Sequence, residues 1–255
     1  MRAIDGFDIE LSDAYKGYSP RVAGPFWRSI DRVSERLHVE LAHPDRIGAG
    51  AALLVMNHAF GWDAMLPMAA IQRATGRQVW ALGEHLWWKV PFLRTLAARV
   101  GAVDGTAANV DRLLQNGELV LVLPGGLREA MKPRELRYRL LWGRRYGFVR
   151  AALRNQARLV PLAGIGADEV FDLVGDAYGR GRRWLKRDFP IPRPEWGLPI
   201  PHFPRLRYIV GDPIEATLMP DETEEHAARR LRREARGALE ELIDDALAER
   251  AGVRP

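Results

Sequence analysis

Residues 53–65 read LLVMNHAFGWDAM, and the first four form an unbroken apolar run. A run without polar alternation is typical of a strand that is covered on both faces of a parallel sheet. The polar residues Asn57 and His58 follow it directly. We therefore expect a buried strand that places two polar side chains just beyond its end.

The second feature of this stretch is the spacing of His58 and Asp63. On one regular helix the two side chains would lie roughly 140° apart, but Gly61 allows the chain to turn between them. A carboxylate that holds one imidazole nitrogen leaves the other free to accept a proton, which is how a general base works. The alternative is a hydrogen-bonded core histidine, with Asp63 as the N-cap of a helix over residues 63–76.

A second apolar run, residues 119–123, stops at the sequence PGG, residues 124–126. Glycines after a strand let backbone amides approach a polar or anionic ligand, and Arg128 adds a forked set of donors. Glu129 is expected either to orient this arginine or to receive protons. The alternative is a tight strand-to-helix turn with solvated charges.

The rest of the chain alternates short apolar runs with helical periodicity. We predict one α/β domain over residues 1–255, with a central, mostly parallel sheet flanked by helices. Residues 1–24 are expected to form a polar arm and residues 25–250 the core. The expected elements include an amphipathic helix near the N-terminus (25–40), further strands at 79–82, within 157–172 and at 205–214, a short turn-bounded segment at 101–106, a helix at 109–116 and a charged C-terminal helix (221–250).

Composition limits the possible chemistry. The chain has no cysteine, and none of its serines lies beyond Ser34, so neither a thiol nucleophile nor a GxSxG elbow is available. His58 would therefore have to activate a hydroxyl of the substrate. Phosphate-binding GxxxxGK[ST] and metal-binding HExxH motifs are absent as well, and we expect neither a cofactor nor a metal.

The net charge of +5 favours an anionic partner such as a phosphate or a phospholipid surface. No apolar run approaches the roughly 20 residues of a membrane-spanning helix, and the N-terminus lacks the apolar core of a signal peptide. We expect a cytoplasmic protein bound peripherally to the inner face of the membrane. Two segments mix cations with aromatic residues, as membrane interfaces do: residues 83–101 and 179–205. For residues 83–101, core packing of a helix broken by proline is an equal alternative. A basic run over residues 132–154 is expected to be a solvated helix face.

Several blocks together resemble the glycerolipid acyltransferase superfamily, which includes lysophospholipid acyltransferases. NHAFGWD at 57–63 resembles its NHxxxxD block. LVLPGGLREAM at 121–131 is similar to its FPEGTRS block, in the PGGxRE form of type-2 diacylglycerol acyltransferases and phytyl ester synthases. The resemblance covers residues 25–245 through three further blocks, at 101–103, 159–166 and 210–214.

The resemblance implies an O-acyltransferase that moves a fatty acyl group from acyl-CoA or acyl-carrier protein to the hydroxyl of a lysophospholipid or an acylglycerol. It implies that His58 is the catalytic base and Asp63 its orienting acid. The substrate-binding residues it implies are Asn57, Gly125, Gly126, Arg128 and Glu129.

The sequence departs from the phospholipid-type pattern at Gly125, where those members carry glutamate, and at Leu127, where they carry threonine. These departures favour a neutral acceptor, whereas the basic balance favours a phosphate-bearing one. Three alternatives therefore stay open: an ester synthase that uses a long-chain alcohol, a non-catalytic membrane lipid-binding module, and a nucleic-acid binder. The last rests on charge alone, because no nucleic-acid-binding motif is present, and we expect no nucleic-acid partner.

Overall fold

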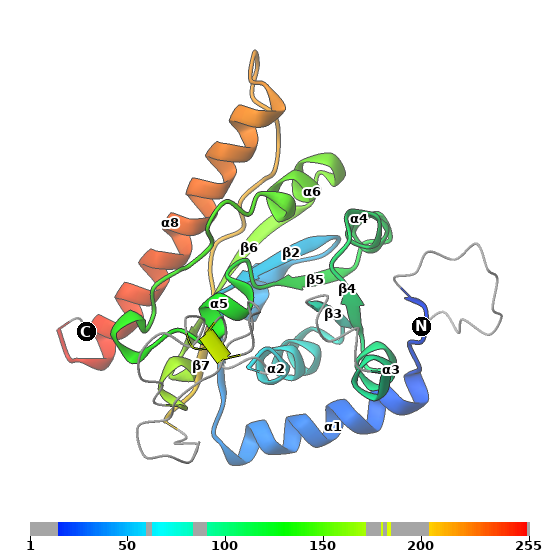
Figure 1. Cartoon of the computed structure of the whole chain (residues 1–255), viewed down its shortest axis with the longest axis vertical. Coiled ribbons are helices and arrows are strands. Elements are labelled where there is room, and N and C mark those ends of the chain that lie inside the picture. The colour runs from blue at the N-terminus through cyan, green and yellow to red at the C-terminus, as the bar shows by residue number, and fades with distance from the viewer. Residues whose placement is uncertain are drawn as a thin grey trace.

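The computed structural model describes residues 15–59, 63–83, 91–171, 180, 183–184 and 204–253, with the backbone alone at 91–94. Within these residues seven strands form one sheet in the order β1-β7-β6-β2-β5-β3-β4 (Figure 1). The strands are β1 (Glu40–Ala42), β2 (Ala52–Met56), β3 (Val79–Gly83), β4 (Ala102–Asp104), β5 (Leu119–Val122), β6 (Arg158–Ile165) and β7 (Arg207–Val210).

Every pairing in this sheet is parallel except that of β6 with β7. The prediction of a mostly parallel α/β sheet is therefore confirmed. β2 occupies the central position, between β5 and β6. Because all three run in the same direction, their carboxyl ends meet at one edge of the sheet, which is where open α/β folds bind ligands.

The unbroken apolar run of β2 reflects burial on both faces. Leu53 and Val55 pack into one core cluster, with residues from α6 and α8, and Leu54 and Met56 pack into the other, with residues from α1 and α2. Alternate side chains of a strand point to opposite faces, so a strand that is covered twice needs apolar residues at every position.

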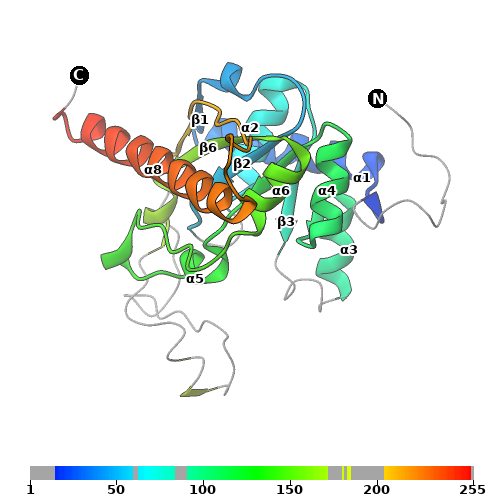
Figure 2. The same ribbon diagram turned by 90° about the horizontal axis from the view of Figure 1, so that it is seen from above.

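Helices cover both faces of the sheet, with α4, α6 and α8 on one side and α1 and α2 on the other (Figures 1 and 2). The α-helices that the structure describes are α1 (Pro20–Arg36), α2 (Met65–Thr75), α3 (Pro91–Arg99), α4 (Ala107–Gln115), α5 (Gly126–Ala130), α6 (Gly147–Asn155) and α8 (Glu224–Arg250).

Two of these helices begin at a threonine N-cap, whose side chain accepts a backbone N–H of the first turn. Thr106 caps α4, and Thr223 caps α8. The C-terminal helix agrees with its predicted position, and Leu231, Ala235 and Leu239 are buried as expected. Three short 3₁₀ turns complete the described structure: Pro44–Ile47, Arg134–Leu136 and Ala167–Glu169.

The predicted N-terminal helix is present, but its first and last residues differ from the prediction. It starts at Pro20 instead of residue 25, because proline is well suited to the first helical turn, and it ends at Arg36. Residues 15–24 are thus not all part of a polar arm. Glu40 belongs to β1, an unpredicted strand that is too short to show an alternating pattern.

Other expected features lie partly outside the described residues. The structure does not describe residues 84–90 of the segment 83–101, or most of the segment 179–205. None of the described helices combines the length and apolar character needed to cross a bilayer.

Candidate active site

His58 and Asp63 meet at the corner between β2 and α2. The Nδ1 atom of His58 lies 2.8 Å from the Oδ1 atom of Asp63, and neither atom has another hydrogen-bond partner among the described residues. The second oxygen of Asp63, Oδ2, accepts the backbone N–H of Ala59 at 2.8 Å. Asp63 therefore does not cap α2, whose N-cap is Ala64, and its carboxylate is committed to the histidine and the turn.

The charges around His58 favour its protonated form. Burial lowers the pKa of His58, because His58 is 8% exposed, but the adjacent Asp63 carboxylate raises it, helped by Glu129. Lys132 opposes this effect, and the net result is a pKa above the ordinary histidine value. An imidazole of this kind takes up a proton more readily than a free one, and Asp63 stabilises the imidazolium that results.

Glu129 is a buried side chain that accepts the backbone N–H of His58. Its side chain is 0% exposed. Its Oε1 atom accepts the N–H of His58 at 2.8 Å, and its Oε2 atom accepts the N–H of Leu141 at 2.6 Å. Burial raises the pKa of Glu129, while Lys132 and the two N–H donors partly offset that rise.

The conformation of Glu129 explains why residue 125 is a glycine. A Cβ atom at residue 125 would lie 2.1 Å from Oε2 of Glu129 and 2.3 Å from its Cβ atom. No pair of unbonded heavy atoms tolerates these distances, so any larger residue at 125 must displace the glutamate. Gly126 lies in the left-handed region, with φ of +53°, which glycine adopts without strain.

Lys132 holds the other side of the His58 backbone. Its Nζ atom donates to the carbonyl oxygen of His58 at 2.7 Å and lies 2.6 Å from Oδ1 of Asp168. The side chains of Lys132 and Asp168 are 2% and 3% exposed, so this is a buried ion pair. Oδ2 of Asp168 accepts the N–H of Tyr138 at 2.6 Å. The corner that holds His58 is thereby tied to the segment after β6, which contains Asp168.

Asn57 links the end of β2 to β6 by a reciprocal pair of hydrogen bonds. Its Nδ2 atom donates to the carbonyl oxygen of Gly164 at 3.0 Å, and its Oδ1 atom accepts the N–H of Gly164 at 2.7 Å. Tyr208 of β7, which is fully buried, lies beneath the same corner and donates to the carbonyl oxygen of Asp63 at 3.4 Å. These contacts fix the chain directly before and after the imidazole.

The structure separates the predicted substrate-binding residues into two groups. Asn57 and Glu129 are buried and bonded to the backbone, so they position His58 and present no polar atom to a substrate in this arrangement. Glu129 does not orient Arg128, because both of its oxygens accept backbone N–H groups. Arg128 is exposed on α5, with no hydrogen bond or ion pair to the described residues, and stays available to a ligand.

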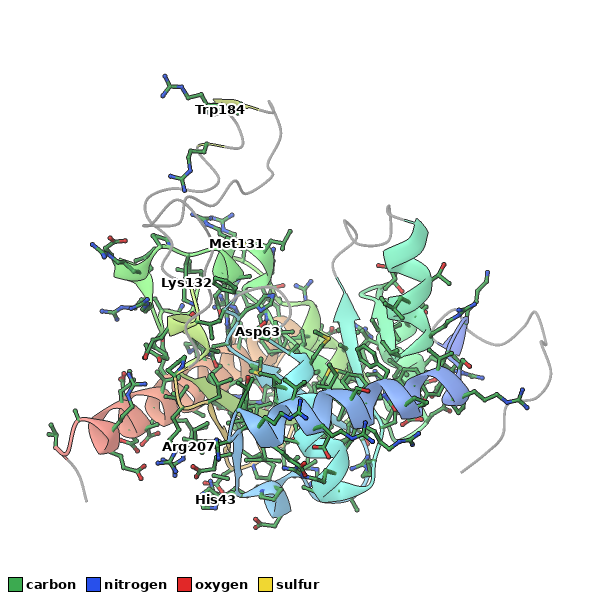
Figure 3. All side chains as sticks on the ribbon, turned by 90° about the horizontal axis from the view of Figure 1, so that it is seen from below. His43, Asp63, Met131, Lys132, Trp184 and Arg207 are labelled. Atoms are coloured by element: carbon green, nitrogen blue, oxygen red, sulfur yellow. The ribbon has the colours of Figure 1, made fainter. Side chains whose placement is uncertain are left out.

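The roles of Lys132 and Asp168 differ from what the sequence pattern indicates. The basic run over residues 132–154 predicts a solvated Lys132, but this side chain is buried. A usable signal was present, since Glu129 and Lys132 are three residues apart and such pairs share one face of a helical turn. Asp168 follows β6 at the edge where the carboxyl end of β2 also lies. Figure 3 shows Asp63 and Lys132 in the same region of the molecule, away from His43 and Arg207 at the opposite edge.

Comparisons with known proteins identify the family of the chain. The family model described as "Diacylglycerol acyltransferase" matches residues 81–253. A mouse protein, "DGAT1/2-independent enzyme synthesizing storage lipids", is 31% identical over 203 residues, which are 78% of this chain and 58% of the mouse protein. The chain thus spans little more than half the length of this relative.

Two further similarities concern a local segment and the fold. Phytyl ester synthase 1 of Arabidopsis thaliana is 42% identical over 76 residues, which are 30% of this chain and 11% of that protein. The crystal structure of the 1-acyl-sn-glycerophosphate acyltransferase PlsC from Thermotoga maritima superposes with a TM-score of 0.54 at 15% identity. It covers 85% of this chain and 79% of its own, and it supports the α/β architecture.

We predict that Gly125→Ala destabilises the protein by about 1–3 kcal/mol, because the new methyl group displaces the Glu129 side chain that holds His58. Urea unfolding measures the change. Gly237→Ala on α8 is the matched control, because a Cβ atom there meets nothing within 4 Å and alanine favours the helix. The control should gain up to about 1 kcal/mol. Equal effects at the two positions would contradict the assigned contact.

We predict that Lys132→Met destabilises the protein by about 3–5 kcal/mol, because it leaves the buried Asp168 carboxylate without its cation. Burial raises the pKa of Asp168, and Lys132 lowers it, so the pKa rises further in the variant. Acid then protonates the unpaired carboxylate in the folded state first, and the deficit shrinks as the pH falls.

Urea unfolding of Lys132→Met at mildly alkaline and mildly acidic pH checks this prediction. Arg139→Met, which removes an exposed cation from the same segment, is the control and should change stability by less than about 0.5 kcal/mol. A deficit no larger than that of the control, or one that does not vary with pH, would contradict the buried pair.

Proposed function

Because the chain belongs to the diacylglycerol acyltransferase family, we propose that it transfers a fatty acyl group from a thioester donor to the hydroxyl of a glycerolipid acceptor. The donor is acyl-CoA or acyl-carrier protein, and the acceptor is an acylglycerol or a lysophospholipid. The observation that carries the proposal is the 2.8 Å contact between His58 and Asp63, on a backbone held from both sides.

The proposed reaction is a direct displacement. Asp63 holds the proton on Nδ1, so Nε2 of His58 removes the proton from the acceptor hydroxyl. The oxygen attacks the thioester carbonyl carbon and forms a tetrahedral intermediate. The intermediate collapses as the carbon–sulfur bond breaks, and the thiolate takes the proton back from the imidazolium. The products are an ester and a free thiol, and His58 returns to its neutral form.

The available side chains support a mechanism without a covalent acyl-enzyme on serine or cysteine. The chain has no cysteine. Its last serine, Ser34, is buried in α1 and donates to the carbonyl oxygen of Ile30 at 3.0 Å. The backbone amide of Gly125 is a candidate for stabilising the developing oxyanion, because its turn adjoins the residue that holds His58. The N–H of Gly126 already donates to the carbonyl oxygen of Leu123 at 3.0 Å.

Arg128 is the proposed contact for the acceptor. It is exposed on α5, one turn from the Gly125–Gly126 corner, and a guanidinium can bind either a phosphate or ester oxygens. The local match to phytyl ester synthase favours a second candidate, the esterification of a long-chain alcohol, since a neutral acceptor of that kind needs the same base.

We further propose that the protein acts at the inner face of a membrane, as a peripheral protein in the cytoplasm. Trp184 is 77% exposed and projects away from the body of the protein (Figure 3). Arg183 lies beside it in the sequence and is also exposed. An exposed tryptophan next to an arginine suits the headgroup region of an anionic membrane.

The decisive experiment measures transfer from labelled acyl-CoA and acyl-carrier protein to monoacylglycerol, diacylglycerol, two lysophospholipids and a long-chain alcohol. We expect a product with at least one glycerolipid and a loss of about 10²–10⁴-fold in His58→Ala. His226→Ala, at an exposed position of α8, is the control. Near-normal turnover in a folded His58→Ala variant would rule out the mechanism. Absence of product with every acceptor would favour the non-catalytic lipid-binding module.

We predict that Asp63→Asn lowers turnover by roughly 10²-fold or more and also moves the pH profile. The Asp63 carboxylate raises the pKa of His58, so its removal lowers that pKa. Since the base acts in its neutral form, the acid limb of kcat/KM moves to lower pH. Asp244→Asn, an exposed change of the same kind on α8, should leave the limb in place. An unmoved limb in Asp63→Asn would show that another group titrates.

A further inference from the structure

A groove of about 760 Å³ lies beside the catalytic corner, on the side of the sheet that α4 and α6 cover. Its apolar wall contains Leu82 of β3, Val122 of β5, Val110 of α4 and Phe148 of α6. Its volume is within the range of small-molecule and cofactor sites. We call it the basic groove, because Arg144, Arg145 and Arg150 also line it.

The basic groove is positively charged. Among the described residues that line it, three are arginines and none is acidic. Arg144 is exposed and has no hydrogen bond or ion pair with the described residues. Arg150 has an exposed partner, Glu225, at 3.4 Å, which is a weak contact. The groove therefore combines an apolar wall with guanidinium groups that can bind an anion.

Residues 143–146, which include Arg144 and Arg145, are held in place by contacts with α8. Arg232 donates from Nη2 to the carbonyl oxygen of Gly143 at 2.6 Å and from Nε to that of Arg145 at 3.2 Å. Its guanidinium also lies 5.1 Å from the centre of the Tyr146 ring. Arg145 in turn donates to the carbonyl oxygen of Pro124 at 2.7 Å. The backbone that carries Arg144 and the side chain of Arg145 are thus held near the end of β5 before any ligand binds.

The basic groove adjoins the catalytic corner through the turn after β5. Pro124 and Gly126 line the groove, and Glu129, three residues after Gly126, accepts the N–H of His58. β2 and β5 are paired neighbours, with Val55 opposite Val122. A molecule that lies in the groove can therefore extend around this turn toward the imidazole.

We infer that the basic groove binds the phosphopantetheine portion of the acyl donor, with Arg144 and Arg150 on its phosphate groups. This inference rests on the proposed acyl transfer. Both donor classes present the thioester on a phosphopantetheine arm, in which methylene and dimethyl groups, two amides and a hydroxyl lead to a phosphate. The apolar wall suits the methylene and dimethyl groups, and planar guanidinium groups suit the phosphate. Arg128 lies on α5 and remains for the acceptor.

The kinetic test compares two donors with the same acyl chain. Acyl-CoA carries phosphates, and the acyl thioester of N-acetylcysteamine carries none. In the double variant Arg144→Glu, Arg150→Glu, we expect the ratio of kcat/KM for acyl-CoA to kcat/KM for the short thioester to fall roughly tenfold or more, as two exposed ion pairs are replaced by repulsion. Added salt should reduce the difference. Arg28→Glu on α1, across the sheet, is the control and should leave the ratio unchanged.

Three results, from the kinetic test and from a vesicle-binding measurement on the same variants, would overturn the inference. An unchanged ratio would show that the arginines do not recognise the donor phosphates. A rise confined to the KM of a phosphate-bearing acceptor would assign the groove to that acceptor. Loss of binding to anionic vesicles without any change in the ratio would assign the arginines to the membrane surface.

A binding measurement separates failure of this inference from failure of the proposed function. Calorimetry with CoA and with pantetheine, which lacks the phosphates, requires no turnover. We expect wild-type protein to bind CoA at least tenfold more tightly than pantetheine, and the double variant to lose this preference. If the wild-type protein shows the preference but transfers no acyl group, the groove assignment stands and the proposed reaction fails. If it binds both equally, the assignment is wrong.

Discussion

Both backbone polar groups of His58 are held by buried side chains from the segment after β5. Glu129 accepts the N–H, and Lys132 donates to the carbonyl oxygen. A residue just past the end of a strand has no partner strand to hold it, so its backbone would otherwise bond to water or move. Here two buried side chains make the hydrogen bonds that a neighbouring strand would otherwise make, and they fix the position of the imidazole. The remaining features of the site depend on that constraint, including the glycine at 125 and the buried partner of Lys132.

The same arrangement sets the electrostatics of the corner. Asp63 and Glu129 are acidic and Lys132 is basic, and Asp168 forms an ion pair with Lys132. Burial alone would depress the pKa of His58, but the carboxylates outweigh it. The proposed base needs such a balance of charges, because it must accept a proton and hold it until the leaving group takes it back. Removal of any one charge disturbs the others, because in a poorly solvated interior they interact strongly.

The architecture gives each chemical task its own segment. In the proposed mechanism the corner after β2 supplies the base and the turn after β5 supplies small residues, while α6 and the loop before it supply the arginines of the basic groove. Because β2, β5 and β6 run parallel, these segments emerge at one edge of the sheet. The antiparallel β7 extends the sheet on its far side, where Tyr208 supports the corner from beneath.

The sequence by itself determined the fold class and pointed to the pair of His58 and Asp63, which the structure brings into contact. Unbroken apolar runs require strands covered on both faces, and His58 and the double glycine follow such runs closely. A list of residues also shows that the chain has no cysteine and no serine beyond residue 34. Only the tertiary structure decided what Asn57, Glu129, Lys132 and Asp168 do. Sequence patterns show that a side chain is polar, but not whether it faces solvent, because that depends on contacts such as the one from Lys132 to His58, 74 residues apart. The basic groove also needed the fold, since its walls come from four elements that are separate in the sequence.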